Sequence, residues 1–206
     1  RNTCRFLLSN LYDFDINSDA VPFDQLSMID QYALQELVVF NQTITGHYQA
    51  YNFTAVFHQL ADYCSVQLSS FYLDIVKDRL YVEKAHGPLR RSAQTVCWYL
   101  LDTLTKLMAP ILSFTAEQLS DHYQRDKQES IHLQPFAQLD AIEKSCGPLH
   151  GDGKKRWDLV KSLRSAVLKS IEQQRALGMI KHPLEAQLML SFNFDAINKE
   201  LFELVF

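Results

Sequence analysis

A sustained helical spacing of apolar residues, with few residues that interrupt it, is the feature that most limits what this chain can fold into. Only six of its 206 residues are glycine and six are proline, and such a low count favours long regular elements over loops. Hydrophobic residues make up 47% of the chain, which is enough to bury a substantial core. The sequence therefore predicts a mainly α-helical protein.

The apolar stripes place the individual helices. A helix is expected over 28–51, and others are expected over 1–12, 90–108 and 113–123, because apolar side chains recur there every three or four residues. Two further helices are expected within 53–82, meeting near Leu68 and Ser69. Gly46 is a weak point inside the second helix that the tertiary structure has to tolerate. Together these segments predict an antiparallel helix bundle over residues 1–136.

A change of pattern follows the bundle. Residues 137–152 are irregular and rich in turn formers, so they are expected to be a linker. Residues 153–206 are then expected to form a small helix–strand appendage. It would contain a basic amphipathic helix from about 154 to 177 and a strand over 184–192, where apolar residues alternate. One strand cannot stand alone, so its partners would lie in sequence beyond this chain or in a short piece within it.

Charge is segregated along the chain although its net charge is only −4. Residues 1–76 hold two basic and eight acidic side chains, whereas residues 77–91 hold five basic and two acidic ones. Residues 150–182 hold eight basic and three acidic side chains. Concentrated basic segments are typical of surfaces that bind polyanions, although solvated helix faces carry similar clusters.

The cysteines and the hydropathy profile exclude several other classes of protein. The four cysteines lie far apart without a CxxC pair or histidines at zinc spacing, which predicts reduced thiols in a cytosolic protein and no metal site. No apolar run reaches the roughly 18 to 20 residues that span a bilayer, and no signal peptide is visible. The first residue is not methionine and lies within an expected helix, so we expect a piece of a longer protein.

No arrangement of residues predicts catalysis. The seven histidines are scattered, and none lies beside a serine or cysteine in a recognisable catalytic frame. Asp74 and Asp78 share one helix face, but ion pairs with neighbouring basic side chains explain them better than acid–base chemistry does. No residue of this chain is therefore predicted to be catalytic.

A basic and aromatic cluster surrounds the break between two predicted helices. Arg90 and Arg91 lie at the start of the second of these helices, where the helix dipole disfavours positive charge. Residues placed against such a local preference favour a functional explanation. Guanidinium groups bind phosphates, and an exposed ring stacks on an unpaired base. The competing interpretation is ion pairing inside the bundle, for example of Arg91 with Asp74 or Asp78. The predicted nucleic-acid surface consists of Lys77, Arg79, Tyr81, Arg90, Arg91 and Gln94.

Several longer blocks resemble a known family. "RNTCRFLLSNLYDFD", "DYCSVQLSSFYLDIVKDRLY", "RRSAQTV", "LMAPILSFTAEQL" and "SIHLQPF" are similar, in this order, to the anticodon-binding region of the bacterial type of isoleucyl-tRNA synthetases. "KRWDLVKSLRSAVLKSIEQQRALGMI" resembles the segment that follows it. The resemblance implies a class Ia anticodon-binding helix bundle from an enzyme that joins isoleucine to its tRNA with ATP.

The same resemblance implies what this chain lacks and what it binds. Motifs of the HIGH and KMSKS kinds are absent from it, so we expect the isolated piece to be inactive. ATP and magnesium would belong to a catalytic domain elsewhere, and zinc to a C-terminal module. The expected partner is the anticodon stem-loop of isoleucine tRNA, bound by a cytoplasmic, monomeric protein with no membrane contact. A second basic stripe would follow the RNA backbone, formed by Lys154, Lys155, Arg156 and Arg164.

Three alternatives stay open from the sequence. A valyl-tRNA synthetase shares this type of bundle, although it resembles the chain less. A helical protein-interaction module would turn its basic stripes toward an acidic partner and ignore RNA. A self-contained enzyme with an unrecognised site would turn over a substrate by itself.

Overall fold

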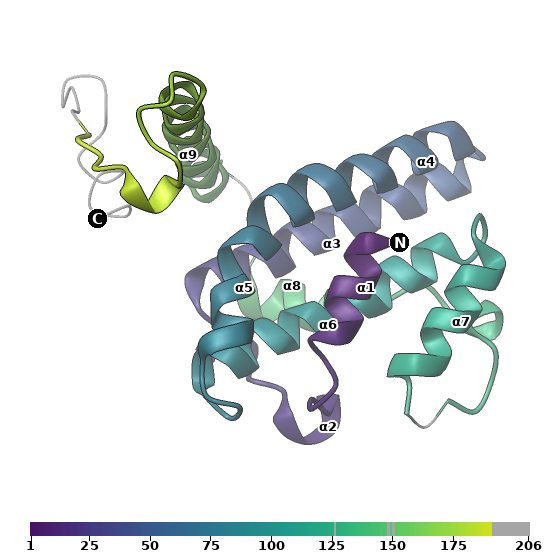
Figure 1. Cartoon of the computed structure of the whole chain (residues 1–206). Coiled ribbons are helices and arrows are strands. Elements are labelled where there is room, and N and C mark those ends of the chain that lie inside the picture. Colours follow the sequence, from purple (N-terminus) through teal and green to yellow (C-terminus); the bar gives the residue numbers. More distant parts are fainter. Residues whose placement is uncertain (126, 148, 150, 191–206) are drawn as a thin grey trace. The chain divides into compact units, whose positions relative to one another are not determined.

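The computed structural model describes residues 1–125, 127–147, 149 and 151–190 (Figure 1). The chain divides into two compact units, residues 1–148 and 149–206. All regular elements within the described ranges are helical, and no β-strand occurs among them. The prediction of a mainly α-helical fold is confirmed.

Eight α-helices build the described part of the first unit. They are α1 (Asn2–Ser9), α2 (Ile16–Asp19), α3 (Met28–Gln49), α4 (Phe53–Asp62), α5 (Leu73–Val82), α6 (Pro88–Met108), α7 (Ser113–Tyr123) and α8 (Asp140–Cys146). Short 3₁₀ turns lie at Phe23–Gln25 (η1) and Ile131–Leu133 (η3). The helices predicted over 28–51, 90–108 and 113–123 are thus confirmed to within a few residues.

The two longest helices of this unit, α3 and α6, lie side by side at its centre (Figure 1). The α6 helix also contacts α1, α5 and α7, while α3 contacts α4 and α8. Because α6 is surrounded, even its threonines are buried, and Thr95 and Thr105 donate to the backbone carbonyls of Arg91 and Leu101 (2.8 and 2.7 Å). Its fully buried aliphatic side chains, each worth roughly 1.5 to 3 kcal/mol of stability, are Val96, Leu100, Leu101, Leu104 and Leu107.

The helical run from α4 to α5 continues through a π-helix, η2 (Tyr63–Tyr72). The Ser69 hydroxyl donates to the Cys64 carbonyl and the Ser70 hydroxyl to the Ser65 carbonyl, each five residues earlier (both 2.8 Å). The junction expected near Leu68 and Ser69 is therefore a change of helical winding rather than a break. Stretches of π-helix of this kind are frequent at functional sites.

The predicted linker is wrong over much of its length. Residues 140–146 form α8, which packs on α3 and belongs to the first unit. Leu139 and Ile142 are buried, and the Gln35 side chain donates to the Cys146 carbonyl (2.6 Å). A helix of seven residues gives too short a periodic pattern to be recognised among turn formers.

The second unit contains α9 (Gly151–Ala176) and the 3₁₀ turn η4 (Pro183–Glu185). The basic helix predicted from about 154 to 177 is confirmed by α9. The strand predicted over 184–192 is wrong in its described part, because 184–185 lie in η4 and 186–190 are irregular. Residues 191–192 lie outside the described residues. An isolated alternating segment has no neighbouring strand to supply backbone hydrogen bonds.

A buried carboxylate fixes the start of α3 against three other elements. Asp30 is fully buried and accepts hydrogen bonds from the hydroxyls of Tyr72 (2.7 Å), Ser92 (2.5 Å) and Ser27 (2.7 Å). Arg79 approaches it to 3.5 Å. Asp30 thus joins α3 to η2, α5 and α6, since a buried charge is tolerated only where such partners surround it.

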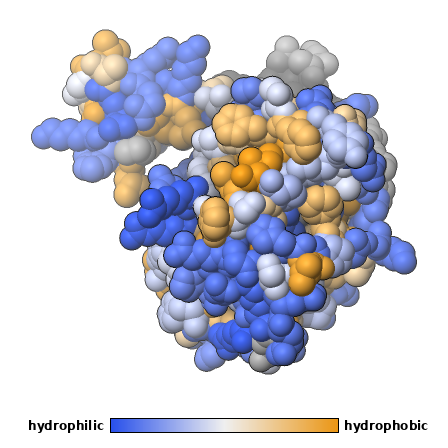
Figure 2. Space-filling view, turned by 90° about the vertical axis from the view of Figure 1, so that its right-hand side faces the viewer, coloured by the Kyte–Doolittle hydropathy of each residue, from blue (hydrophilic) through white to orange (hydrophobic). Residues whose placement is uncertain are grey.

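The surface of the first unit is polar with apolar patches. Figure 2 shows such patches on the side of the molecule that it presents. Exposed apolar side chains occur near the α3–α4 and α6–α7 turns, among them Tyr51, Phe53, Leu112 and Phe114. None of the helices within the described ranges combines the length and the hydropathy that a bilayer crossing requires.

We predict that Tyr72→Phe lowers the free energy of unfolding by about 1.5 to 3 kcal/mol, because it removes one hydrogen bond to the buried Asp30 carboxylate. Chemical denaturation followed by circular dichroism measures the change. Tyr81→Phe is the matched control, since its hydroxyl lies on an exposed side chain, and it should change the unfolding free energy by less than about 0.5 kcal/mol. Equal effects of the two changes would contradict the role given to Asp30.

Candidate nucleic-acid interface

Three residues of the predicted surface are buried. Arg90 is 4% exposed, Arg91 7% and Gln94 0%. The Arg90 guanidinium donates two hydrogen bonds to the Asp13 carboxylate (Nη1 to Oδ2, 2.6 Å; Nη2 to Oδ1, 2.9 Å). The Gln94 amide donates to the same carboxylate (2.8 Å).

Other N–H groups of Arg90 and Arg91 also donate hydrogen bonds to acceptors inside the protein. Arg90 donates to the carbonyls of Leu80 and Ala85 (3.2 and 2.8 Å). Arg91 donates to the Asp13 carbonyl and the Gln94 side-chain oxygen (both 2.8 Å). Most of their donors are therefore used inside the protein, and the burial of Arg90, Arg91 and Gln94 argues against the prediction that they lie on an RNA-facing surface.

The structure favours ion pairing inside the bundle, but with other partners than the sequence suggested. Arg91 lies 3.9 Å from the Asp13 carboxylate and 3.7 Å from that of Asp19, not beside Asp74 or Asp78. The segment after α1 folds back over the start of α6 and brings these carboxylates to it. Hydrogen bonding from Arg90 lowers the pKa of Asp13 from 3.8 to about 2, although partial burial opposes this shift.

The other three residues of the predicted cluster lie nearer the surface. Arg79 is partly buried and turns inward, donating to the Ser27 hydroxyl (3.0 Å) beside Asp30. Lys77 is exposed and pairs with Asp74 through one hydrogen bond (2.7 Å). Tyr81 is 63% exposed. Lys77 and Tyr81 are thus the members of this cluster that solvent, and hence RNA, can reach.

Lys77 lines a shallow groove between α1 and the helical run η2–α5, and Tyr81 contacts Phe6, another residue of its lining. The groove has a volume of about 260 Å³. The Phe6 ring lies 6.2 Å from the Tyr81 ring, measured between centroids, in an edge-on arrangement. We call it the α1–α5 groove; it is lined by Asn2, Thr3, Phe6, Ser69, Leu73, Asp74 and Lys77.

The winding of η2 places a hydroxyl in the α1–α5 groove. The Ser69 hydroxyl, which bonds to a carbonyl five residues earlier, lies 3.4 Å from the Thr3 hydroxyl on α1. An exposed cation, Lys77, lines the groove, and another exposed cation, Arg5, precedes Phe6 on α1. The groove therefore combines rings that stack on bases, hydroxyls that form hydrogen bonds, and cations that attract phosphates.

The sequence indicated that Arg1, Asn2, Arg5 and Asn10 face either the RNA or the rest of the enzyme, but it missed the ring of Phe6 that α1 contributes to the groove. Phe6 stands directly before Leu7 and Leu8, so its hydrophobicity indicated core packing rather than a partly exposed ring. The signal that was available is Arg5 next to Phe6, since a cation beside a ring is common where nucleic acid binds. Asn10, by contrast, is buried, and its side chain donates to the Phe6 carbonyl (2.8 Å).

The second predicted stripe lies on α9 in the second unit. Lys154 and Lys155 are exposed, while Arg156 and Arg164 are partly exposed. All four lie between residues 154 and 164 of this 26-residue helix. They form a basic surface of the second unit.

Comparisons with known proteins show which family this chain resembles. The family model described as the anticodon-binding domain of tRNA ligase matches residues 30–203. An isoleucine–tRNA ligase of Geobacter sulfurreducens is 38% identical over 191 residues, which is 93% of this chain and 20% of that protein. Isoleucine–tRNA ligases of Azoarcus sp. and Desulfitobacterium hafniense are each 42% identical over 195 residues, 95% of this chain. The chain spans about a fifth of the length of these curated relatives.

We predict that Asp13→Asn lowers the free energy of unfolding by about 3 kcal/mol at neutral pH, because it leaves buried guanidinium groups without their anion. The folded-state pKa of Asp13, about 2, lies below its ordinary value of 3.8. Its stabilisation is therefore fully present above about pH 4 and is lost as the pH falls toward about 2.

Denaturation of the wild type and Asp13→Asn at a series of pH values measures this effect. The difference in unfolding free energy between them should shrink as the pH falls through that window. Asp24→Asn changes an exposed carboxylate in the 3₁₀ turn η1 and serves as the matched control. A difference for Asp13→Asn that stays constant with pH would contradict the assigned ion pair.

Proposed function

The chain belongs to the family of anticodon-binding domains of tRNA ligases, and from this premise we propose that it binds the anticodon stem-loop of isoleucine tRNA. The observation that carries the proposal is the similarity to isoleucine–tRNA ligases over more than nine tenths of the chain. The exposed rings and cations of the α1–α5 groove support it, because single-stranded RNA loops are read by stacking and by contacts to phosphates.

The activity of the whole protein is part of this proposal. The complete ligase would join isoleucine to its tRNA with ATP, and regions beyond this chain would bind ATP, magnesium and any zinc. The 206-residue chain alone would be inactive in charging and would act as a monomer. A cytoplasmic location suits the four cysteines, which are all free thiols in the structure.

The contacts to RNA divide between stacking and charge. Tyr81 and Phe6 would stack on unpaired bases of the anticodon loop, since their rings meet edge-on and Tyr81 is well exposed. Lys77 and Arg5 would hold phosphates beside them. On the second unit, Lys154, Lys155, Arg156 and Arg164 would follow the backbone of the stem.

Titration of the chain with isoleucine tRNA and with a non-cognate tRNA, at low and at physiological salt, tests the proposal. Preferential and salt-sensitive binding of isoleucine tRNA is expected. Equal binding of both tRNAs would place discrimination in other parts of the ligase. Binding of neither RNA would contradict the proposal and favour a protein-interaction module.

We predict that Tyr81→Ala weakens RNA binding by about 1 to 3 kcal/mol, because it removes a stacking platform. A filter-binding or fluorescence titration measures the loss. Phe114→Ala is the matched control, since it also removes an exposed ring, but from α7 and outside the α1–α5 groove. If both changes weaken binding equally, the groove is not the site of base stacking.

We predict that Lys77→Ala weakens binding of every tRNA and lowers the slope of log K against log salt by roughly 0.7 to 0.9. Titrations over a series of salt concentrations measure this slope. Lys144→Ala removes the same charge from the exposed face of α8 and should leave the slope unchanged. An unchanged slope for Lys77→Ala would show that this side chain makes no phosphate contact.

A further inference from the structure

The turn between α3 and α4 exposes a group of aromatic rings at one end of the first unit (Figure 1). Tyr51 is 80% exposed, Phe57 59% and Phe53 50%. The Phe53 ring lies edge-on to the rings of Tyr51 and Tyr48, with centroids 6.3 and 6.1 Å apart. Phe57 follows Phe53 by four residues, so both lie on one face of α4. We call Tyr48, Tyr51, Phe53 and Phe57 the α3–α4 tip.

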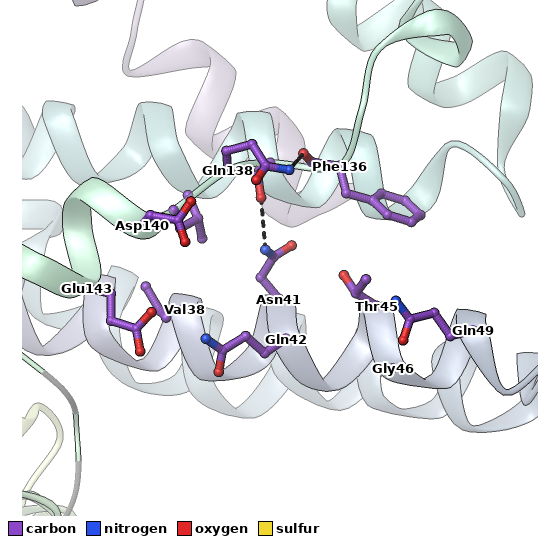
Figure 3. Close-up of a pocket in the computed structure, with 12 residues that line it drawn as sticks. Val38, Asn41, Gln42, Thr45, Gly46, Gln49, Phe136, Gln138, Asp140 and Glu143 are labelled. Carbon is purple, nitrogen blue, oxygen red and sulfur yellow. Dashed lines mark hydrogen bonds between the residues drawn. The ribbon is translucent and has the colours of Figure 1, made fainter.

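The aromatic surface of the α3–α4 tip continues onto a neighbouring segment of the first unit. Phe136 stacks on Tyr48, with 5.4 Å between the ring centroids. Figure 3 shows Phe136 on the segment opposite α3, across a cavity of about 330 Å³ that Gln49 also lines. The Asn41 side chain holds this segment to α3 by donating to the Ala137 carbonyl (3.0 Å). The fold therefore supports the tip on one side and leaves its outer rings open to solvent.

The backbone of Tyr51 adopts a conformation that suits glycine. Its φ is +55°, and among the residues that the structure describes no other non-glycine residue has a positive φ. The amides of Tyr51 and Asn52 donate to the carbonyls of Tyr48 and His47 (3.0 and 2.9 Å), just after α3 ends at Gln49. In this Schellman arrangement the position of Tyr51 is usually occupied by glycine, because a Cβ atom disfavours a positive φ. Tyrosine therefore costs stability here.

The first unit gains little from the Tyr51 ring in return. Its edge-on contact with Phe53 is the one aromatic contact of this ring within the described part of the chain. Its hydroxyl forms no hydrogen bond there, whereas the Tyr48 hydroxyl donates to the Leu107 carbonyl (2.7 Å). A bulky residue that is strained and exposed, with no evident benefit to the fold, favours a functional explanation.

The lack of charge around the α3–α4 tip selects the kind of partner. Residues 37–61 contain no aspartate, glutamate, lysine or arginine. RNA binding draws much of its affinity from cations that contact phosphates, so the tip is poorly suited to RNA although its rings resemble those that stack on bases. The cores of protein–protein interfaces are depleted of charge and enriched in tyrosine and phenylalanine. The tip therefore suits an apolar protein surface.

The length of the relatives indicates which protein surface this is. The chain spans 20% of the isoleucine–tRNA ligases of Geobacter sulfurreducens and Azoarcus sp., so about four fifths of each of those proteins lies outside the matched region. Domains of one polypeptide meet through interfaces that resemble those between separate proteins. An exposed apolar patch on one domain is therefore matched to another domain of the same chain before any separate protein is invoked.

We propose that the α3–α4 tip docks against an apolar, uncharged surface of another domain of the same ligase. Tyr51, Phe53 and Phe57 are buried in that contact, and the Tyr51 hydroxyl donates to an acceptor across it. The contact offsets the cost of placing tyrosine at a positive φ. This inference rests on the chain being part of a complete ligase, as proposed above, and not on RNA binding.

Hydroxyl-radical footprinting of the 206-residue chain and of the complete ligase, both without tRNA, tests the proposal. We expect Tyr51 and Phe57 to be oxidised several-fold more slowly in the complete ligase, because another domain covers them. Tyr81 is the internal reference, since it is also exposed but lies outside the tip, and its oxidation rate should be the same in both proteins. Equal oxidation of the tip in the two proteins overturns the proposal.

Two further measurements identify other occupants of the tip. Oxidation of the 206-residue chain is followed over a range of chain concentrations, and again with isoleucine tRNA added. Protection that grows with chain concentration assigns the tip to a second copy, and protection by tRNA assigns it to RNA; either result overturns the proposal. Loss of tRNA binding while the tip stays covered in the complete ligase would contradict the proposed RNA binding alone.

Variants of Tyr51 separate docking from folding. Tyr51→Gly supplies the residue that a positive φ favours, so the 206-residue chain should melt at the same or a higher temperature. In the complete ligase the same change should raise the oxidation of Phe57 several-fold, because a docked ring is lost. Tyr51→Phe keeps the ring and is the matched control, which should leave Phe57 covered. A lower melting temperature of the 206-residue chain with Phe57 still covered in the ligase would show that the ring is structural and would overturn the proposal.

Discussion

The pairing of Asp13 with Arg90 is the interaction on which the arrangement of the first unit most depends. Two arginines lie at the start of α6, where the helix dipole disfavours positive charge and burial adds a large desolvation cost. The Asp13 carboxylate and the carbonyls around it offset that cost by accepting most of the guanidinium hydrogen bonds. Because Asp13 follows α1 directly, the pairing also fixes α1 against α6 and helps to hold it beside α5.

The α1–α5 groove is a consequence of that arrangement. Arg90 and Arg91 pair with Asp13, and Arg79 contacts Ser27 and Asp30. Of the lysines and arginines in the predicted RNA-binding cluster, Lys77 is therefore the one whose side chain is well exposed to solvent. The ring of Tyr81 meets Phe6 of α1 at the same place. A cluster that is continuous in sequence is therefore divided in the structure. Its buried arginines form ion pairs that stabilise the fold, whereas Lys77 and Tyr81 remain exposed for the proposed RNA binding.

The α3–α4 tip differs from the α1–α5 groove in its charge. Residues 37–61 carry no lysine, arginine, aspartate or glutamate, so the rings of the tip suit an apolar protein surface better than a polyanion. A chain with a net charge of −4 is compatible with the proposed RNA binding because its charge is segregated along the sequence rather than spread evenly. The groove and the tip are built from different elements and can be tested independently.

The sequence by itself determined the helical class, the positions of the long helices and the family resemblance, because these depend on local periodicity and on recognisable blocks. Tertiary structure alone decided that Arg90, Arg91 and Gln94 are internal, that Phe6 joins the groove, and that residues 140–146 pack on α3. Asp13 lies 77 positions before Arg90 in the chain, and no helical period relates them. The physical reason is that the direction in which a charged side chain points is set by the partner that satisfies it, and that partner is brought near only by folding.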